Sequence, residues 1–205
     1  MVACQTAPRP QPKSLTLPAS VDELIAAVAA DSKRSDRETD SRMREQLAAD
    51  AGRNADACIA LEPKSAGCQY YHGIALGLEA KAHPTRAGAL LKSMLDALSG
   101  ADVTDPNYDR AGPARVRALV LVRAPGWPLG PGDADSGLAA AHRAVSLQPG
   151  YPPNVLALAE AQNKTGDTHG AQESYAHART LAQALPPGGD RDAWLHEAEQ
   201  ALTSH

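Results

Sequence analysis

The residue types that could do chemistry in this chain are three cysteines, seven histidines and a glycine- and proline-rich stretch, RAPGWPLGPGD, at residues 123–133. The histidines form no His-Glu-x-x-His motif and no i, i+4 pair, and no Cys₂His₂ spacing occurs, so the sequence predicts no metal site. The glycines of residues 126–132 are not followed by the Gly-Lys-Ser or Gly-Lys-Thr of a phosphate-binding loop. No Gly-x-Ser-x-Gly motif presents a nucleophile. We therefore expect a protein that is not an enzyme and needs no cofactor.

Two of the cysteines flank a proline at equal distances. Cys58 lies five residues before Pro63 and Cys68 five residues after it. In an antiparallel helix hairpin, residues equally far from the turn face each other, so a disulfide could form without backbone movement. Such a bond is typical of an oxidising compartment. The alternative is a pair of buried thiols that pack as small apolar residues, and the sequence leaves both open.

The third cysteine, Cys4, follows Val-Ala and precedes a proline- and glutamine-rich segment. This end resembles the last residues of a bacterial lipoprotein signal, roughly Leu-x-Ala/Gly-Cys, without the charged and apolar part that comes before them. The resemblance implies that Cys4 carries a lipid, that residues 5–18 are a tether, and that the protein is periplasmic, at the outer membrane. The alternative is an ordinary disordered tail with an incidental cysteine.

The composition favours an all-α protein. The chain has 205 residues, which is enough for one domain with a core, and it is rich in alanine while it contains no Phe. Its formal net charge of −4 gives no reason to expect binding to nucleic acid or to an anionic bilayer. No run of eighteen apolar residues could span a membrane, so we expect contact with a membrane through the N-terminal lipid only.

The strongest signal in the chain is a repeat. Three matched pairs of residues are each 34 positions apart: Gly132 and Gly166, Asp133 and Asp167, and Ala144 and Ala178. The interval, the Gly166-Asp167 turn and the step from Ala171 to Tyr175 resemble tetratricopeptide repeats, in which small residues let two antiparallel helices approach and a ring fills the gap between units. A weaker copy runs through Ala51, Ala55 and Cys58.

The chain then divides into a disordered segment, residues 1–18, and one helical-repeat domain, residues 19–205. We expect about four helix pairs and a C-terminal capping helix. The pairs are Ser20–Ala30 with Asp36–Leu61, Ser65–Ala82 with Pro84–Ser99, Gly112–Arg123 with Asp135–Leu147, and Pro153–Lys164 with Thr168–Ala184; the capping helix is Asp190–Leu202. Ser20 and Glu23 form a capping box at the first helix start.

The stretch at residues 123–133 interrupts this pattern, because three prolines and three glycines cannot continue a helix. We interpret it as a lengthened turn between the two helices of one repeat and as a favoured place for specific function. Trp127 is large and apolar, so the sequence favours a ring buried as an anchor over a ring that contacts a partner.

The segment from Tyr108 to Asp167, with RAPGWPLGPGD at residues 123–133, QPGYPPN at residues 148–154 and CQYYHGIALGL at residues 68–78, resembles the T-component proteins associated with TRAP (tripartite ATP-independent periplasmic) transporters. The resemblance covers roughly residues 51–181. It implies a periplasmic, lipid-anchored repeat protein that partners a solute-binding component, and it allows a homo-oligomer with a ligand groove or pore. The chain departs from the pattern by lacking a Trp at the expected position of the first repeat helix.

Two patches fall on the first helices of the repeats, which line the concave wall of such a stack. Candidate ligand- or partner-binding residues are Tyr70, Tyr71, His72, Arg115, Arg117, Arg123, Trp127, Glu160 and Asn163. The alternative, which the sequence favours, is that the arginines, Arg110 included, are solvated or paired with Asp102, Asp105 and Asp109 and that the tyrosines are core. We expect the partner to be another protein; a carrier of a small, apolar ligand is the second hypothesis.

Overall fold

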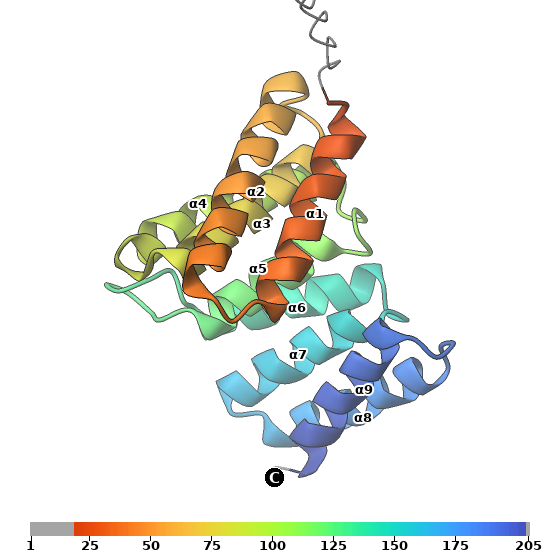
Figure 1. The fold of residues 1–205 in the computed structure, drawn as a ribbon. Helices are drawn as coiled ribbons and strands as arrows, with labels where there is room; N and C mark the ends of the chain where they lie inside the picture. The colour runs from red at the N-terminus through yellow and green to blue at the C-terminus, as the bar shows by residue number, and fades with distance from the viewer. Residues whose placement is uncertain (1–18, 204–205) are drawn as a thin grey trace, which may run out of the picture.

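The structure, a computed structural model, describes residues 19–203 and folds them into nine α-helices without a strand (Figure 1). The helices are α1 (Val21–Arg37), α2 (Ser41–Leu61), α3 (Ala66–Ala82), α4 (Ala87–Thr104), α5 (Gly112–Arg123), α6 (Ala134–Leu147), α7 (Pro152–Thr165), α8 (Thr168–Gln183) and α9 (Gly189–Thr203), with the short 3₁₀ turn η1 (Pro84–Arg86) before α4. The predicted all-α stack of four pairs and a terminal helix is confirmed. Cys4 and the tether lie outside the described residues.

Short polar side chains begin most of these helices. Ser20 accepts a hydrogen bond from the Glu23 amide while the Glu23 carboxylate accepts one from the Ser20 amide, so the predicted capping box is present. Ser65 and Asp133 cap α3 and α6 by accepting hydrogen bonds from the Cys68 and Ser136 amides. Gly166 ends α7 with φ of 91°, a left-handed conformation that glycine adopts without strain. Local sequence therefore accounts for many of the helix boundaries.

Three expected helix boundaries, at two places in the chain, were wrong. The first helix does not end at Ala30 but continues to Arg37, and the next begins at Ser41 because Asp40 accepts hydrogen bonds from the Arg42 and Met43 amides. The helix expected to end at Ser99 continues to Thr104, since Ala101 and Asp102 are buried against neighbouring elements. In both places contacts or caps outside the apolar pattern set the end of the helix.

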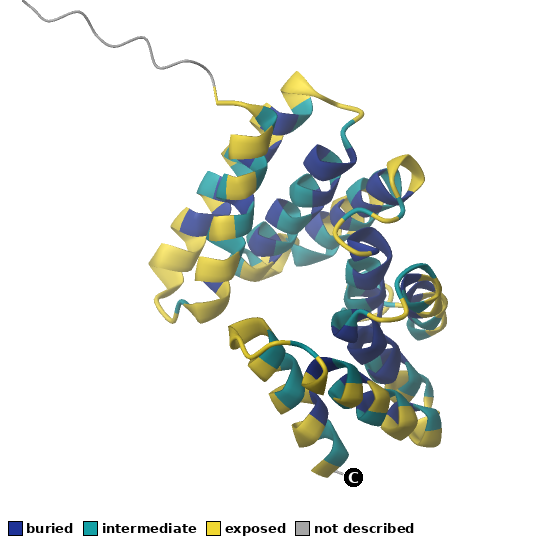
Figure 2. Ribbon diagram, turned by 90° about the vertical axis from the view of Figure 1, so that its right-hand side faces the viewer, coloured by how far each residue is buried: buried dark blue, intermediate teal, exposed yellow. Residues whose placement is uncertain are grey.

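Each helix packs mainly against the next one along the chain. In addition, α1 contacts α3 and α5 contacts α7, so the first helices of adjacent pairs also meet. The helices follow a curved path from the amino-terminal pair to the carboxy-terminal pair (Figure 2). α6 and α8 begin 34 residues apart, at Ala134 and Thr168, which is the interval seen in the sequence. Within the described residues, no helix is long and apolar enough to cross a membrane.

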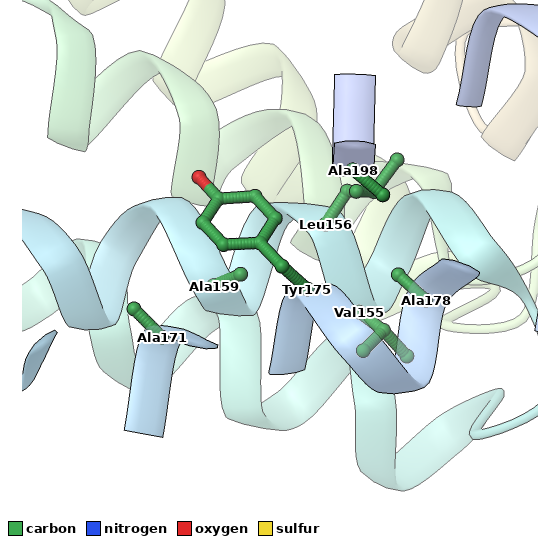
Figure 3. Close-up of a cluster of buried hydrophobic side chains, with 7 residues drawn as sticks. All are labelled: Val155, Leu156, Ala159, Ala171, Tyr175, Ala178 and Ala198. Atoms are coloured by element: carbon green, nitrogen blue, oxygen red, sulfur yellow. The ribbon is translucent and has the colours of Figure 1, made fainter. Parts of the chain in front are cut away.

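Alanine makes the close packing feasible. In the last repeat the ring of Tyr175 lies beside Ala159, and Ala171 and Ala178 flank it along α8 (Figure 3). Ala198 of α9 is fully buried on the same cluster, so α9 covers the end of the stack. One ring among several small side chains fills the gap between units, as the repeat pattern predicts.

The first repeats are closed by a disulfide. Cys58 near the end of α2 and Cys68 near the start of α3 are bonded, with Cα atoms 5.3 Å apart. Both are buried beside Leu24 of α1. Of the two states that the sequence left open, the structure contains the bonded one.

Candidate interaction surface

An open apolar groove of about 420 Å³ lies between four helices of the first half of the stack. Its walls come from α1, α3, α4 and α5, and its end is formed by the first residues after α5. The groove is lined chiefly by the apolar residues Ile74, Leu78, Leu91, Met94, Leu119 and Val120. We call this site the groove.

Glycine on α3 determines how closely the groove walls meet. A Cβ added at Gly73 would lie 3.1 Å from the Leu98 side chain, and one added at Gly77 would lie 3.0 Å from the Met94 sulfur. The absence of both side chains lets α4 approach α3. The longer side chains at Ile74 and Leu78 line the opening. The mixture of small and large residues on α3 thus produces a recess instead of a filled core.

Ion pairs stand at two edges of the groove. The Lys81 Nζ of α3 lies 3.2 Å from the Asp36 carboxylate of α1. On the other side, Arg123 at the end of α5 donates two hydrogen bonds to Glu160 of α7, of 2.7 and 2.6 Å. Each pair is internally neutral. The groove therefore presents an apolar surface between balanced charges, not an anion- or cation-binding site.

Electrostatics strengthen the second of these pairs. The hydrogen bonds that Arg123 donates to the Glu160 carboxylate raise the pKa of the Arg123 guanidinium. The carboxyl group of Glu197 in α9 interacts electrostatically with both Arg123 and Glu160. Desolvation of its carboxyl raises the pKa of Glu197 although the residue is exposed as a whole, and Arg123 opposes this shift while Glu160 adds to it. Arg123 is thus the cation of a cluster with two carboxylates.

The expected lengthened turn joins α5 to α6 through residues 124–133. Its backbone closes on itself: the Leu129 and Gly130 amides donate to the Gly126 carbonyl, and the Gly132 amide donates to the Pro125 carbonyl. A Cβ at Gly132 would collide with the Ala124 carbonyl, so only glycine fits there. Ala124 and Pro125 line the end of the groove. The turn is a defined structural element attached to the site.

The expectation that Trp127 is a buried anchor was wrong. Trp127 is 91% exposed, and Leu129 is 76% exposed. The loop obtains its order from its backbone hydrogen bonds and from contact of the Leu129 carbonyl with α4 at Gly88. Because the backbone holds the loop, the indole is not needed as an anchor.

Arg115 and Tyr70, two of the candidate residues, meet in a buried polar network. The Arg115 guanidinium donates to the Asp109 carboxylate at 2.7 Å and to the Asn154 side-chain oxygen at 3.1 Å, and the Tyr70 hydroxyl donates to Asp109 at 2.9 Å. Burial, together with the Asp109 charge, raises the pKa of Tyr70. The network joins α3, α5 and α7 at the turn before α5. Burial and hydrogen bonding within the fold therefore account for the positions of Tyr70 and Arg115.

That turn has an unusual backbone. Asp109, Arg110 and Ala111 have φ values of 47, 55 and 63°, in the left-handed region that costs energy for residues other than glycine. The guanidinium of Arg115 donates to the carbonyls of Asp109 and Arg110, and Asn154 also donates to the Arg110 carbonyl. Two buried side chains therefore hold three strained residues in place.

The remaining candidates are spread over the stack. Tyr71 is half-buried and packs edge to face on Tyr70, with ring centroids 5.1 Å apart. His72 lies 3.6 Å from Asp56, and Arg117 lies 4.0 Å from Asp102. Asn163 is exposed on α7. The structure thus brings Arg123 together with Glu160, and Tyr70 with Tyr71 and Arg115, but it does not gather all nine residues into one site.

Most of the candidate arginines are paired with carboxylates, as the alternative favoured by the sequence predicts. Arg115 and Arg117 pair with Asp109 and Asp102, and Arg110 lies over the Tyr151 ring at 4.8 Å. Sequence reasoning missed the apolar lining of the groove, because apolar residues such as Leu91 and Met94 recur at helical spacing whether they face a filled core or an open recess. It also missed Lys81 and Asp36, whose separation in sequence gives no signal. Among the described residues, no group of His, Cys, Asp and Glu could hold a metal ion.

The fold is similar to a crystal structure of a thermophilic TPR protein from Thermus thermophilus, with a TM-score of 0.60 and 20% sequence identity. The likeness covers 89% of this chain and 92% of the other. No family model matches the chain, and no curated protein matches it. The fold and the likeness together define a TPR-like stack of helical repeats.

Proposed function

We propose that the protein is a non-enzymatic scaffold that holds a segment of a partner protein in the groove. The observation that carries the proposal is the open apolar recess between α1, α3, α4 and α5, framed by two neutral ion pairs. Apolar side chains from a partner would fill it without leaving a charge unpaired. Concave recesses of this kind are the surfaces that helical-repeat proteins present to partners.

The candidate residues divide by position under this proposal. Arg123 lines the end of the groove and would contact the partner directly, together with Glu160, to which it is hydrogen-bonded. Tyr71, His72, Arg117 and Asn163 stay proposed contact residues on the surrounding surface, whereas Trp127 is exposed on the loop at the end of the groove. Tyr70 and Arg115 are buried, so their proposed role is to hold the helices that carry the wall.

We further propose a periplasmic location, with a lipid on Cys4 anchoring the chain at the outer membrane and a transporter solute-binding component as the partner. The Val-Ala-Cys motif supports the anchor, and the Cys58–Cys68 disulfide supports an oxidising compartment. The chain extracted from cell envelopes should begin at Cys4 and exceed the mass of residues 4–205 by that of the attached lipid, and Cys4→Ser should release the chain from membranes. A Cys4→Ser chain that stays in the membrane fraction would refute the anchor.

The binding proposal is tested by capture from native envelopes with matched variants. Leu119 lines the groove and Leu61 is exposed at the end of α2. Leu119→Asp should lower the amount of co-purified protein at least about tenfold, because it buries an unpaired carboxylate under the partner. Leu61→Asp adds the same charge elsewhere and should leave capture unchanged. Equal capture by both variants would place the partner on another surface.

A carrier of a small apolar molecule is the second candidate, favoured by the size of the groove. Its volume of about 420 Å³ lies in the range of small-molecule sites, and its lining is chiefly apolar. Native mass spectrometry of the purified chain should then show a retained ligand. Leu119→Trp would fill the groove and remove that ligand, whereas Leu61→Trp would not. A chain that carries no added mass from its native source would contradict this function.

A further inference from the structure

The tip of the loop between α5 and α6 combines exposure with a complete lack of charge. Residues 124–132 read APGWPLGPG, with no ionisable side chain. Trp127 and Leu129 leave 91% and 76% of their surface in water. Large apolar side chains exposed together usually mark a contact surface. Because the tip carries no charge, it could leave water without the cost of desolvating an ion.

Most backbone N–H groups of the tip are already hydrogen-bonded within the protein, so they do not depend on water as a partner. Prolines at 125, 128 and 131 have no N–H group. The amides of Leu129, Gly130 and Gly132 donate to carbonyls inside the loop, and those of Ala124 and Asp133 donate to α5. A protein partner could supply missing hydrogen bonds, but hydrocarbon cannot. Internal closure of most donors is therefore the property that entry into lipid requires.

The loop is held in shape before any contact is made. Gly132 packs on the Ala124 carbonyl, and a Cβ at Gly88 would lie 2.8 Å from the Leu129 carbonyl, so the loop rests on the start of α4. Insertion would then cost little conformational entropy. The nearby cations Arg86 and Arg123 are paired with Glu79 and Glu160. The driving force is consequently apolar, and a zwitterionic surface suffices.

We propose that Trp127 and Leu129 form a wedge that inserts into the boundary between headgroups and acyl chains of a bilayer. Trp prefers this boundary because its ring is apolar and its N–H group remains able to reach polar partners. Ala124 and Pro125, at the base of the wedge, line the groove. Insertion therefore turns the end of the groove toward the membrane.

This contact is additional to an anchor on Cys4 and does not depend on it. Two side chains bind a membrane weakly, in the same way that a single short acyl chain does. A chain already held at the surface would be oriented by the wedge rather than retained by it. The test accordingly holds the chain at the membrane and measures where Trp127 lies.

The experiment uses the full chain coupled through Cys4, the cysteine outside the disulfide, to phosphatidylcholine vesicles that contain a maleimide lipid. The chain has two tryptophans, so Trp194→Phe leaves Trp127 as the reporter. Its emission should move to shorter wavelength on coupling, and lipid brominated near the headgroup end of the acyl chain should quench it roughly twofold. Lipid brominated deep in the chain should quench it less.

Two further variants serve as controls for the Trp127 emission signal. Trp127→Ala retains Trp194, which packs on Tyr151 with ring centroids 5.5 Å apart, and its emission should not respond to vesicles. Leu129→Asp in the Trp194→Phe chain puts a charge on the exposed tip, so it should abolish the shift while the circular dichroism spectrum stays the same.

Two results would overturn the wedge. In the first, coupled Trp127 keeps the emission that it has in solution and escapes both brominated lipids. In the second, the shift appears with rising protein concentration in the absence of vesicles, which would mean that the tip docks into protein. Neither result bears on partner capture through Leu119, so the wedge and the scaffold proposal can fail separately.

Discussion

Arg115 shows how much of the fold depends on single polar residues in an alanine-rich core. Its guanidinium donates to one carboxylate, one side-chain amide and two carbonyls. Those acceptors belong to the turn before α5 and to α7, so one side chain connects two repeats. Removing a buried donor that bonds to the carbonyls of strained residues is costly, because all of its acceptors then lose a hydrogen bond at once.

We predict that Arg115→Met lowers the free energy of unfolding by about 3 kcal/mol, the cost of breaking a buried charged network from one side. Arg117→Met is the control, since Arg117 is only partly buried and lies 4.0 Å from Asp102; it should cost less than about 1 kcal/mol. Urea denaturation measures both. Equal losses would show that the network adds nothing beyond a surface ion pair.

Glu197 makes a pH-dependent contribution. Desolvation and the Glu160 charge raise its pKa in the folded state above the ordinary value of 4.5, so the folded chain is penalised once that carboxyl ionises. The favourable contribution exists at low pH and is lost as the pH rises through the folded pKa. Arg123, which opposes the shift, offsets only part of this penalty.

We therefore predict that Glu197→Gln raises the unfolding temperature slightly at pH 7 and leaves it unchanged at pH 4, where the carboxyl is largely protonated in both states. The gain should be roughly 0.5 kcal/mol or less because the residue is exposed and water screens its charge. Thermal unfolding at the two pH values measures it. A variant that is less stable at pH 7 would show that attraction to Arg123 dominates.

At the scale of elements, the loop of residues 124–133 behaves as a folded unit and not as a slack connection. Its hydrogen bonds are internal, reach back to α5 or, at Asp133, cap the start of α6, and its contact with α4 involves the backbone. This arrangement supports one wall of the groove and presents two apolar side chains outward. A change in the loop backbone should therefore be felt at the groove as well.

We predict that Gly132→Ala destabilises the protein by about 2 kcal/mol and reorganises the loop, because the added methyl collides with the Ala124 carbonyl. Gly150→Ala is matched to it, since a Cβ there meets nothing within 4 Å. Chemical denaturation and the NMR shifts of Leu119 and Val120 report stability and groove structure. Unchanged shifts in the Gly132→Ala chain would contradict the coupling of loop and groove.

At the scale of the whole molecule, stability is distributed along a line, because helices contact mainly their neighbours in the chain. α9 has no following helix within the described residues, and it covers the cluster around Tyr175 through Ala198. Along the curved path in Figure 2, the carboxy-terminal helices lie at the opposite end of the stack from the first pair. Damage at one end should consequently remain local.

We predict that ending the chain at Pro187, before α9, lowers amide protection in α7 and α8 but not in α1 to α3. The exposed cluster should also increase self-association. Hydrogen exchange followed by mass spectrometry measures the protection of each helix. A uniform loss across the chain would show that the stack unfolds as one cooperative unit.

The sequence by itself determined the helical class, the 34-residue interval, most helix boundaries and the lengthened turn at residues 123–133. These features depend on local causes: side chains that cap helix ends, glycine at φ of 91°, prolines that stop a helix, and alanines spaced along one face. Ser20, Gly166 and Tyr175 each signalled their role within a few residues. Such signals do not require knowledge of distant segments.

The tertiary structure alone decided which side chains meet across the stack. Arg123 finds Glu160 37 positions away, Arg115 finds Asn154 39 positions away, and Trp127 is left exposed because backbone bonds already hold its loop. The groove exists because glycines on α3 admit α4 while neighbouring side chains do not fill the space. These outcomes follow from the packing distances and angles between helices, which local propensity and capping do not specify.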